Sequence, residues 1–221
     1  MQRRVAPFAE AITRPDSTLD EITLALSRAL QPGLDVIGAM ADLDALAAAC
    51  PTPTRDGVMR HLVGEARFEG DRSQYHRWQN SCIDHVVATR RGMPITLAVV
   101  AIEVARRVGV RLAGIGLPGH FLVGDPDDPR WFADPFHGHS DLGRDHCRNL
   151  LVQMGATRWS DRYLEPVPDR LIAARMLNNL KQSCDRRDDR VRLAIVMAMR
   201  QTMPEFAAEH DESVQALATL N

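Results

Sequence analysis

Two short apolar runs in the middle of the chain carry a histidine and an aspartate, which are residue types used in acid–base chemistry. His120 lies in the run 119–123, and Asp134 ends the run 131–134. The turn-forming residues between the runs predict an antiparallel hairpin centred near Asp127. In that register His120 faces Asp134, whose carboxylate can bond one imidazole nitrogen and stabilise the imidazolium. This is the base and its orienting group in a catalytic triad.

The same pair has a structural interpretation. A buried histidine is commonly hydrogen-bonded to an aspartate in the core without any catalytic role. The pairing also depends on the register, in which Phe121 faces Ala133, because a slip of one residue places His120 and Asp134 on opposite faces of the sheet. The decision between catalysis and packing therefore rests on a third residue, the nucleophile.

Cys82 is the nucleophile that local chemistry favours. Asn80 and Ser81 are good helix-capping residues, and Ser81 with Asp84 forms a capping-box pattern, so Cys82 is predicted in the first turn of a helix. A helix N-terminus lowers the pKa of a thiol and so favours the reactive thiolate. Asp84 opposes that effect, and a buried cysteine that only packs is the alternative. Cys147 is interpreted as structural.

A metal-binding interpretation uses three further histidines. His137, His139 and His146 closely follow Asp134 and supply nitrogen and oxygen donors. The spacing has little specificity, because a His-x-His pair in a glycine-containing loop is common. The residues 114–116 lack the third glycine of a dinucleotide fingerprint, so no bound cofactor is expected.

Helical patterns surround these residues on both sides. From Ser17 to about Phe68 apolar residues recur with helical period, which predicts a helical N-terminal lobe over residues 1–70. A core is predicted over 71–165, and a helical C-terminal extension, packed on that core, over 166–221.

The core is predicted to contain one long buried helix and a small sheet. Pro94 opens the helix and Gly109 follows its end near Val108, in their usual positions. Short extended runs at 111–116, 119–123 and 131–133 then predict strands. Helices followed by a small sheet and further helices indicate the α+β class.

Composition excludes several functions. The 221 residues include 27 Lys and Arg against 29 Asp and Glu, so the net charge of −2 gives no support to nucleic-acid binding or to an anionic membrane surface. No apolar run approaches the length of a membrane span, and the N-terminus lacks an apolar leader segment. Four scattered cysteines without Cys-x-x-Cys spacing fit a reducing compartment. A cytoplasmic protein is therefore expected.

Several linked motifs in order resemble the SirB-type family, by its N-terminal domain, of the transglutaminase-like superfamily. The resemblance spans roughly residues 75–185 and rests on the segments 80–84, 90–97, 105–110, 118–123, 134–136 and 175–181. It implies a papain-like or transglutaminase-like core, in which a central helix packs on an antiparallel sheet and His120 and Asp134 lie on neighbouring strands.

The resemblance fails at the residue that covalent chemistry needs. In catalytic transglutaminase-like enzymes a cysteine opens the central helix and is followed at fixed distances by Ala, Arg and Gly. Counting back from Gly109, Arg106 and Ala98 places that cysteine at Pro94, and proline cannot act as a nucleophile. The site is then vestigial, or Cys82 reaches it from the preceding helix, or Thr96 serves one turn along.

These observations lead to three hypotheses about function, of which the first two rest on the His120 and Asp134 pair. We expect a noncatalytic or catalytically reduced protein that acts through an unknown protein partner. The alternative is an acyl-transfer enzyme of the amidase, protease or transamidase kind acting on a peptide or amide substrate, with Cys82 as nucleophile, His120 as base and Asp134 as orienter. The third is a metal-binding protein that uses His137, His139 or His146.

Overall fold

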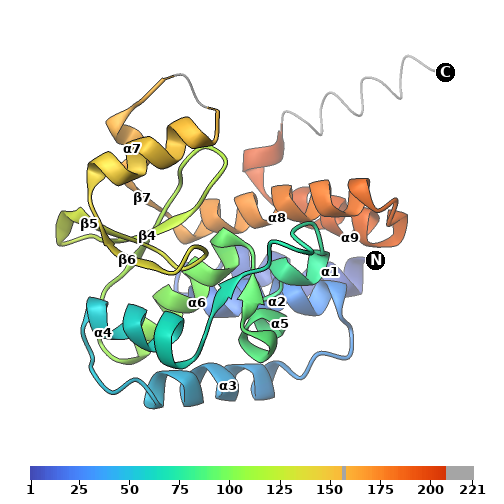
Figure 1. Cartoon of the computed structure of the whole chain (residues 1–221). Coiled ribbons are helices and arrows are strands. Elements are labelled where there is room, and N and C mark those ends of the chain that lie inside the picture. Colours follow the sequence, from blue (N-terminus) through green and yellow to red (C-terminus); the bar gives the residue numbers. More distant parts are fainter. Residues whose placement is uncertain (156–157, 208–221) are drawn as a thin grey trace.

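A computed structural model describes residues 1–155 and 158–207. Its α-helices over these residues are α1 (Gln2–Thr13), α2 (Leu19–Leu30), α3 (Val36–Ala48), α4 (Arg55–Arg60), α5 (Ile83–Thr89), α6 (Pro94–Arg107), α7 (Arg144–Gln153), α8 (Asp169–Arg186) and α9 (Arg190–Arg200). The strands are β1 (Glu69–Gly70), β2 (Arg91–Gly92), β3 (Ala113–Ile115), β4 (Leu122–Asp125), β5 (Asp128–Asp134), β6 (His139–Leu142) and β7 (Pro166–Val167). The predicted α+β class is confirmed (Figure 1).

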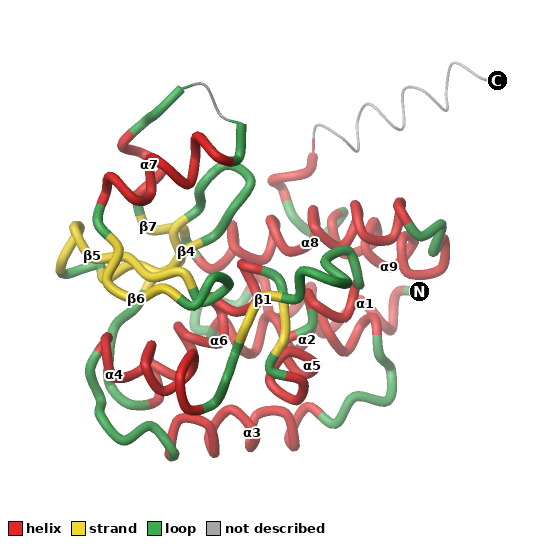
Figure 2. The backbone as a smooth tube through the Cα atoms, viewed as in Figure 1, coloured by secondary structure: helices red, strands yellow, loops and turns green. Residues whose placement is uncertain are grey.

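The strands form two separate sheets (Figure 2). The larger is an antiparallel sheet in the order β6-β5-β4-β3-β7, and the smaller is the parallel pair β1 and β2. Side chains of the larger sheet alternate between two apolar clusters. Val123 and Ala133 belong to the main core with α6, whereas Leu122 and Phe132 join a second cluster with Cys147 of α7. The sheet therefore lies between α6 and α7.

The central helix α6 is buried along most of its length. Pro94 occupies its first position, and Gly109 follows its end in the left-handed conformation with φ of 76°. Its buried residues include Leu97, Val100 and Val104, so the helix packs on several sides at once. Helices α2, α3, α4, α5 and α8 contact it, as does the sheet through β3 and β4. The predicted helix over 94–108 is confirmed to within one residue.

The structure differs from the sequence prediction at the first two helices and at strand β6. No separate helix was predicted before Ser17, and helix α1 lies there with Pro7 in its interior. Helix α2 is capped by Thr18, one residue after the start of the predicted helical pattern, and the Glu21 carboxylate accepts a hydrogen bond from the Thr18 N–H at 3.2 Å. Strand β6 was also missed, since its residues His139–Leu142 read as a loop.

One hydrophobic core joins the three predicted units. Buried residues from α1 to α3, from α5 and α6, and from α8 and α9 belong to the same apolar cluster. Helix α1 packs against α2 and α9. The boundaries at 70 and 165 stay predictions, and residues 208–221 of the predicted extension lie outside the described residues. No helix in the described ranges is long and apolar enough to cross a membrane.

Candidate functional site

The predicted contact between His120 and Asp134 is present, although the strand register differs from the predicted one. His120 Nε2 and Asp134 Oδ2 are 2.8 Å apart. Ala133 faces Val123, two residues along from the predicted partner Phe121, and the register shifts at a bulge next to Asp125. A shift of two residues leaves each side chain on its predicted face. His120 itself lies in the loop before β4 rather than on a strand.

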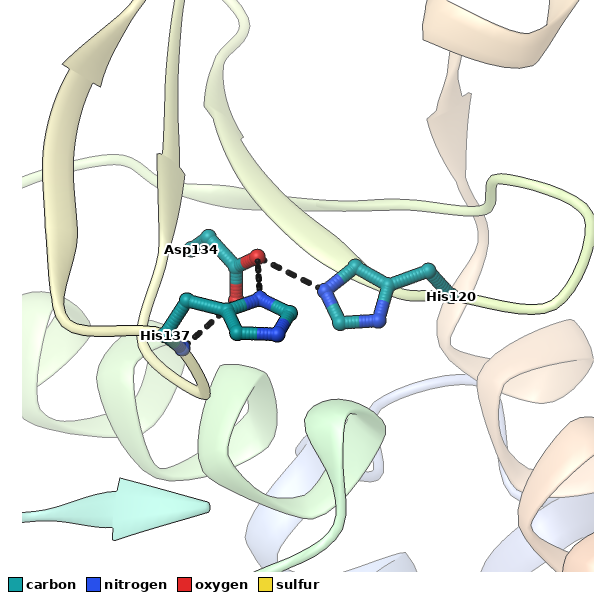
Figure 3. A group of neighbouring side chains, drawn as sticks. All are labelled: His120, Asp134 and His137. Atoms are coloured by element: carbon teal, nitrogen blue, oxygen red, sulfur yellow. Dashed lines mark hydrogen bonds and ion pairs between the residues drawn. The ribbon is translucent and has the colours of Figure 1, made fainter. Parts of the chain in front are cut away.

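The Asp134 carboxylate accepts four hydrogen bonds. Its Oδ1 accepts from the backbone N–H groups of Phe136 at 3.0 Å and His137 at 3.2 Å. Its Oδ2 faces two imidazole nitrogens, His120 Nε2 at 2.8 Å and His137 Nδ1 at 2.7 Å. Figure 3 shows both rings directed at this one oxygen. The turn after β5 therefore places a second histidine on the carboxylate.

Phe136 is a positioning residue that sequence reasoning missed. Its ring meets the His120 ring edge to face, with centroids 5.9 Å apart, and the His137 ring at 5.0 Å. The close approach of Gly70 fixes Phe136 from the other side, because a Cβ added to Gly70 would lie 2.4 Å from the Phe136 ring. The hydrophobicity of Phe136 and its place in the 134–136 motif carried no signal for this role.

The electrostatics of the site favour a charged carboxylate. Burial raises the pKa of Asp134, but the hydrogen bonds and positive charges of His120 and His137 outweigh burial and hold that pKa below its usual value. Asp134 is fully buried and His120 is 3% exposed. A buried carboxylate of this kind can hold an imidazole in one orientation and stabilise its charged form.

His120 opens into a pocket of about 380 Å³ at the start of α6. Pro94 lines the same pocket, so the proline stands beside the histidine where the resemblance assigns the nucleophile. Arg175 of α8 also lines it, and its guanidinium donates to the carbonyl oxygens of Leu117 and, at 2.6 Å, His120. Arg175 thereby fixes the backbone that carries the histidine. No carboxylate in the described part of the chain forms a salt bridge with Arg175.

Cys82 lies in an environment opposite to the one predicted. It is the N-cap of α5 and is fully buried in the main core. Burial, assisted by the negative charge of Asp84, raises the pKa of the Cys82 thiol well above its usual value, whereas the helix position predicted a lowered pKa. Cys82 does not line the pocket of His120. Its role as nucleophile stays a prediction that this environment disfavours.

The other candidate nucleophile and the structural cysteine are also buried. Thr96 is 0% exposed, and its hydroxyl has no hydrogen-bond partner among the described residues. Cys147 of α7 packs in the second apolar cluster, as its structural interpretation predicted. Burial raises the pKa of Cys147 to about 11.

The histidines proposed as metal ligands do not form one set. Among the described residues, the cluster with ligand atoms within 4.8 Å of one another is His120, Asp134 and His137. His139 and His146 continue from it as a row of rings, with centroids 6.3 Å from His137 to His139 and 5.6 Å from His139 to His146. The predicted set of three sequential histidines is therefore replaced by a set that includes the hairpin histidine.

A central helix on an antiparallel sheet, with His120 and Asp134 beside the start of that helix, defines a papain-like or transglutaminase-like α+β protein. The sequence model described as "Transglutaminase-like superfamily" matches residues 17–178. The chain therefore belongs to the transglutaminase-like superfamily. The match begins near α2 and extends into α8, and so includes much of the predicted N-terminal lobe.

Relatives of this chain include bacterial and animal proteins. A UPF0162 protein of Xylella fastidiosa is 40% identical over 129 residues, which cover 56% of this chain and 46% of the relative. A UPF0162 protein of Pseudomonas aeruginosa is 30% identical over 144 residues, covering 64% and 52%. F-box only protein 21 of Mus musculus is 32% identical over 68 residues, covering 31% and 11%. The chain spans about half the length of the UPF0162 relatives. No solved structure matches it with significance.

Proposed function

We propose that this chain is a SirB-type member of the superfamily that binds a peptide or amide-bearing segment of a protein partner and performs no acyl transfer. The observation that carries the proposal is Pro94 in the pocket of His120. Acyl transfer needs a nucleophile within hydrogen-bond reach of the base, and proline has no nucleophilic group. In this proposal the histidine and its carboxylate act without the third member of the triad.

The state of Cys82 supports the same proposal. A catalytic thiol works as a thiolate and has a lowered pKa, next to a cation or a helix N-terminus. Burial and Asp84 instead keep Cys82 protonated. A thiol enzyme using Cys82, His120 and Asp134 would require the core around α5 to open, so we place it second.

The lining of the pocket supports peptide binding. The side chains of Asn178, Asn179 and Gln182 on α8 line it beside the Arg175 guanidinium. Amide groups both donate and accept hydrogen bonds, which suits them to the N–H and C=O groups of a peptide backbone. The Arg175 guanidinium, which forms no salt bridge within the described residues, favours a carbonyl or carboxylate of the ligand. Apolar residues at the start of α6 complete a wall of the kind that ligand pockets use.

The relatives and the cysteines fit this picture. The segment similar to this chain makes up 11% of an F-box only protein, so a related segment occurs as a small part of a much longer protein. All four cysteines, which lie within the described residues, are free thiols, and we assign the protein to the reducing cytoplasm on that basis.

Turnover tests the absence of acyl transfer. The chain is incubated with casein and a fluorescent primary amine, and separately with peptide amides, and product is compared with buffer alone. We expect no product above buffer. Product formation that His120→Ala abolishes would overturn the proposal, and its loss in a separate Cys82→Ala variant as well would identify Cys82 as the nucleophile.

Binding tests the positive half of the proposal. A peptide array of defined sequences is probed with the natural chain and with Gln182→Ala. We expect peptides whose signal falls in Gln182→Ala and is retained in Gln2→Ala, the matched control at an exposed glutamine that does not line this pocket. Absence of any peptide signal, or equal signals for both variants, would contradict a peptide site at α8.

A further inference from the structure

The two histidines and the aspartate of the site present their donor atoms to one point. His120 Nε2 and His137 Nδ1 lie 2.8 and 2.7 Å from the same oxygen, Asp134 Oδ2. All three ligand atoms lie within 4.8 Å of one another (Figure 3). We propose that His120, Asp134 and His137 bind one divalent transition-metal ion.

The chemistry of the donors selects the class of metal. Two imidazole nitrogens and one carboxylate oxygen suit Zn²⁺, Co²⁺, Ni²⁺ or Fe²⁺, whereas Mg²⁺ and Ca²⁺ prefer oxygen donors throughout. Ligation requires both facing nitrogens to be unprotonated. The metal ion thus takes the place of the imidazole protons that point at Asp134: a charged ring releases its facing proton to solvent, and a neutral ring carries its proton on the other nitrogen. Three protein ligands leave at least one coordination position for water or another small ligand.

The ligands are held in place before any metal binds. The backbone N–H groups after Asp134 fix the carboxylate through Oδ1, which leaves Oδ2 for the metal. Phe136 packs edge to face on both imidazole rings, and Arg175 holds the carbonyl of His120. Contacts of this kind around a metal site orient the ligands and raise affinity.

His137 is the ligand of the proposed site that is most exposed to solvent. Two of the ligands are almost fully buried, but the His137 side chain is 25% exposed. His137 lines a second pocket, of about 770 Å³, with Phe136 and Gly138. His137 is therefore the ligand that an ion would meet first from solvent.

Neighbouring histidines supply the matched control. His139 and His146 are exposed and continue the row of rings from His137, but they are absent from the cluster of converging ligand atoms. A surface histidine pair of this kind binds metal ions weakly by itself. Replacing it removes adventitious binding and leaves the proposed site intact.

The experiment uses the full chain, freed of metal with a chelator and dialysed. Zn²⁺ is titrated by calorimetry, and Co²⁺ is titrated by its visible absorption, which reports nitrogen and oxygen ligation directly. We expect one ion per chain in the natural sequence and in the double variant His139→Ala with His146→Ala. His137→Ala is expected to weaken binding at least about tenfold, since even an outer contact of a metal site is worth that much.

Folding is controlled with a second variant. Far-ultraviolet circular dichroism is recorded for each chain, and His137→Gln replaces His137→Ala if the alanine variant is unfolded. Three results would overturn the proposal: no binding of Zn²⁺ or Co²⁺ by the natural chain, loss of binding in the His139 and His146 double variant, or unchanged affinity in the folded His137 variant. None of these bears on the peptide signal at Gln182, so this inference and the proposed function fail separately.

Discussion

The strongest stability prediction concerns Asp134, the acceptor at the centre of the site. Replacing it by alanine leaves four donors without their acceptor: two backbone N–H groups and the nitrogens of His120 and His137. At about 1 kcal/mol for each unsatisfied donor, the Asp134→Ala variant loses about 4 kcal/mol of unfolding free energy. Asp134→Asn keeps an oxygen for the two backbone groups and loses about 2 kcal/mol.

Urea unfolding followed by circular dichroism measures both losses. Asp16→Ala is the matched control, because Asp16 is an exposed aspartate whose partner is the surface residue Arg14, and it is expected to change the midpoint little. A loss below about 1 kcal/mol in Asp134→Ala would refute the idea that these four bonds hold the site together. Equal losses in the alanine and asparagine variants would refute the division between backbone and imidazole bonds.

The difference in unfolding free energy between the natural chain and Asp134→Asn should depend on pH in a direction that the structure fixes. The histidines hold the pKa of Asp134 below its usual value of about 3.9. The stabilising contribution of the ionised carboxylate is therefore complete above about pH 4 and is lost as the pH falls through the lowered pKa. The difference in unfolding free energy between the natural chain and Asp134→Asn should shrink in acid, and a difference that grows there would contradict this assignment.

Three further predictions follow from burial and backbone geometry. In alkylation followed by mass spectrometry, partly exposed Cys50 should react first. Cys147, whose pKa burial raises to about 11, should react only after unfolding. Equal rates for the two cysteines would contradict the burial of Cys147. Gly119→Ala forces φ of 76° on alanine and should lower the free energy of unfolding, measured with urea, by about 1 kcal/mol, whereas Gly33→Ala, outside the left-handed region and with open space, should not. Leu97→Ala in α6 should cost about 2–5 kcal/mol in the same assay, and a smaller loss would contradict the tight core.

Elements with strong local signals could be predicted from the sequence. Helix α6 was predicted because Pro94 and Gly109 mark its ends and apolar residues fill its interior. The contact of His120 with Asp134 was predicted although the register was wrong by two residues, because side-chain direction in a strand repeats every two residues. An even-numbered error in the register leaves both side chains on the same face of the sheet, so the contact is predicted without the exact pairing.

What the sequence could not supply depends on tertiary packing. His137 joins Asp134 because the turn after β5 folds back on the carboxylate, and no spacing rule predicts which of several nearby histidines does so. The raised pKa of Cys82 reflects burial by distant segments, which a helix-terminus rule ignores. Helix α1 combines a mid-helix proline with packing on α2 and α9, and is thus stabilised by contacts that lie far apart in sequence.

Restoring a thiol at the start of α6 tests most directly whether Pro94 occupies the nucleophile position beside His120. The variant Pro94→Cys is alkylated with iodoacetamide near pH 6.5, and each cysteine is followed by mass spectrometry. The new thiol should react faster than Cys50, and His120→Ala in the same chain should slow it, because an adjacent imidazolium lowers the pKa of a thiol. A new thiol that reacts no faster than Cys50, or one that His120→Ala leaves unchanged, would contradict a superfamily-type site at this pocket.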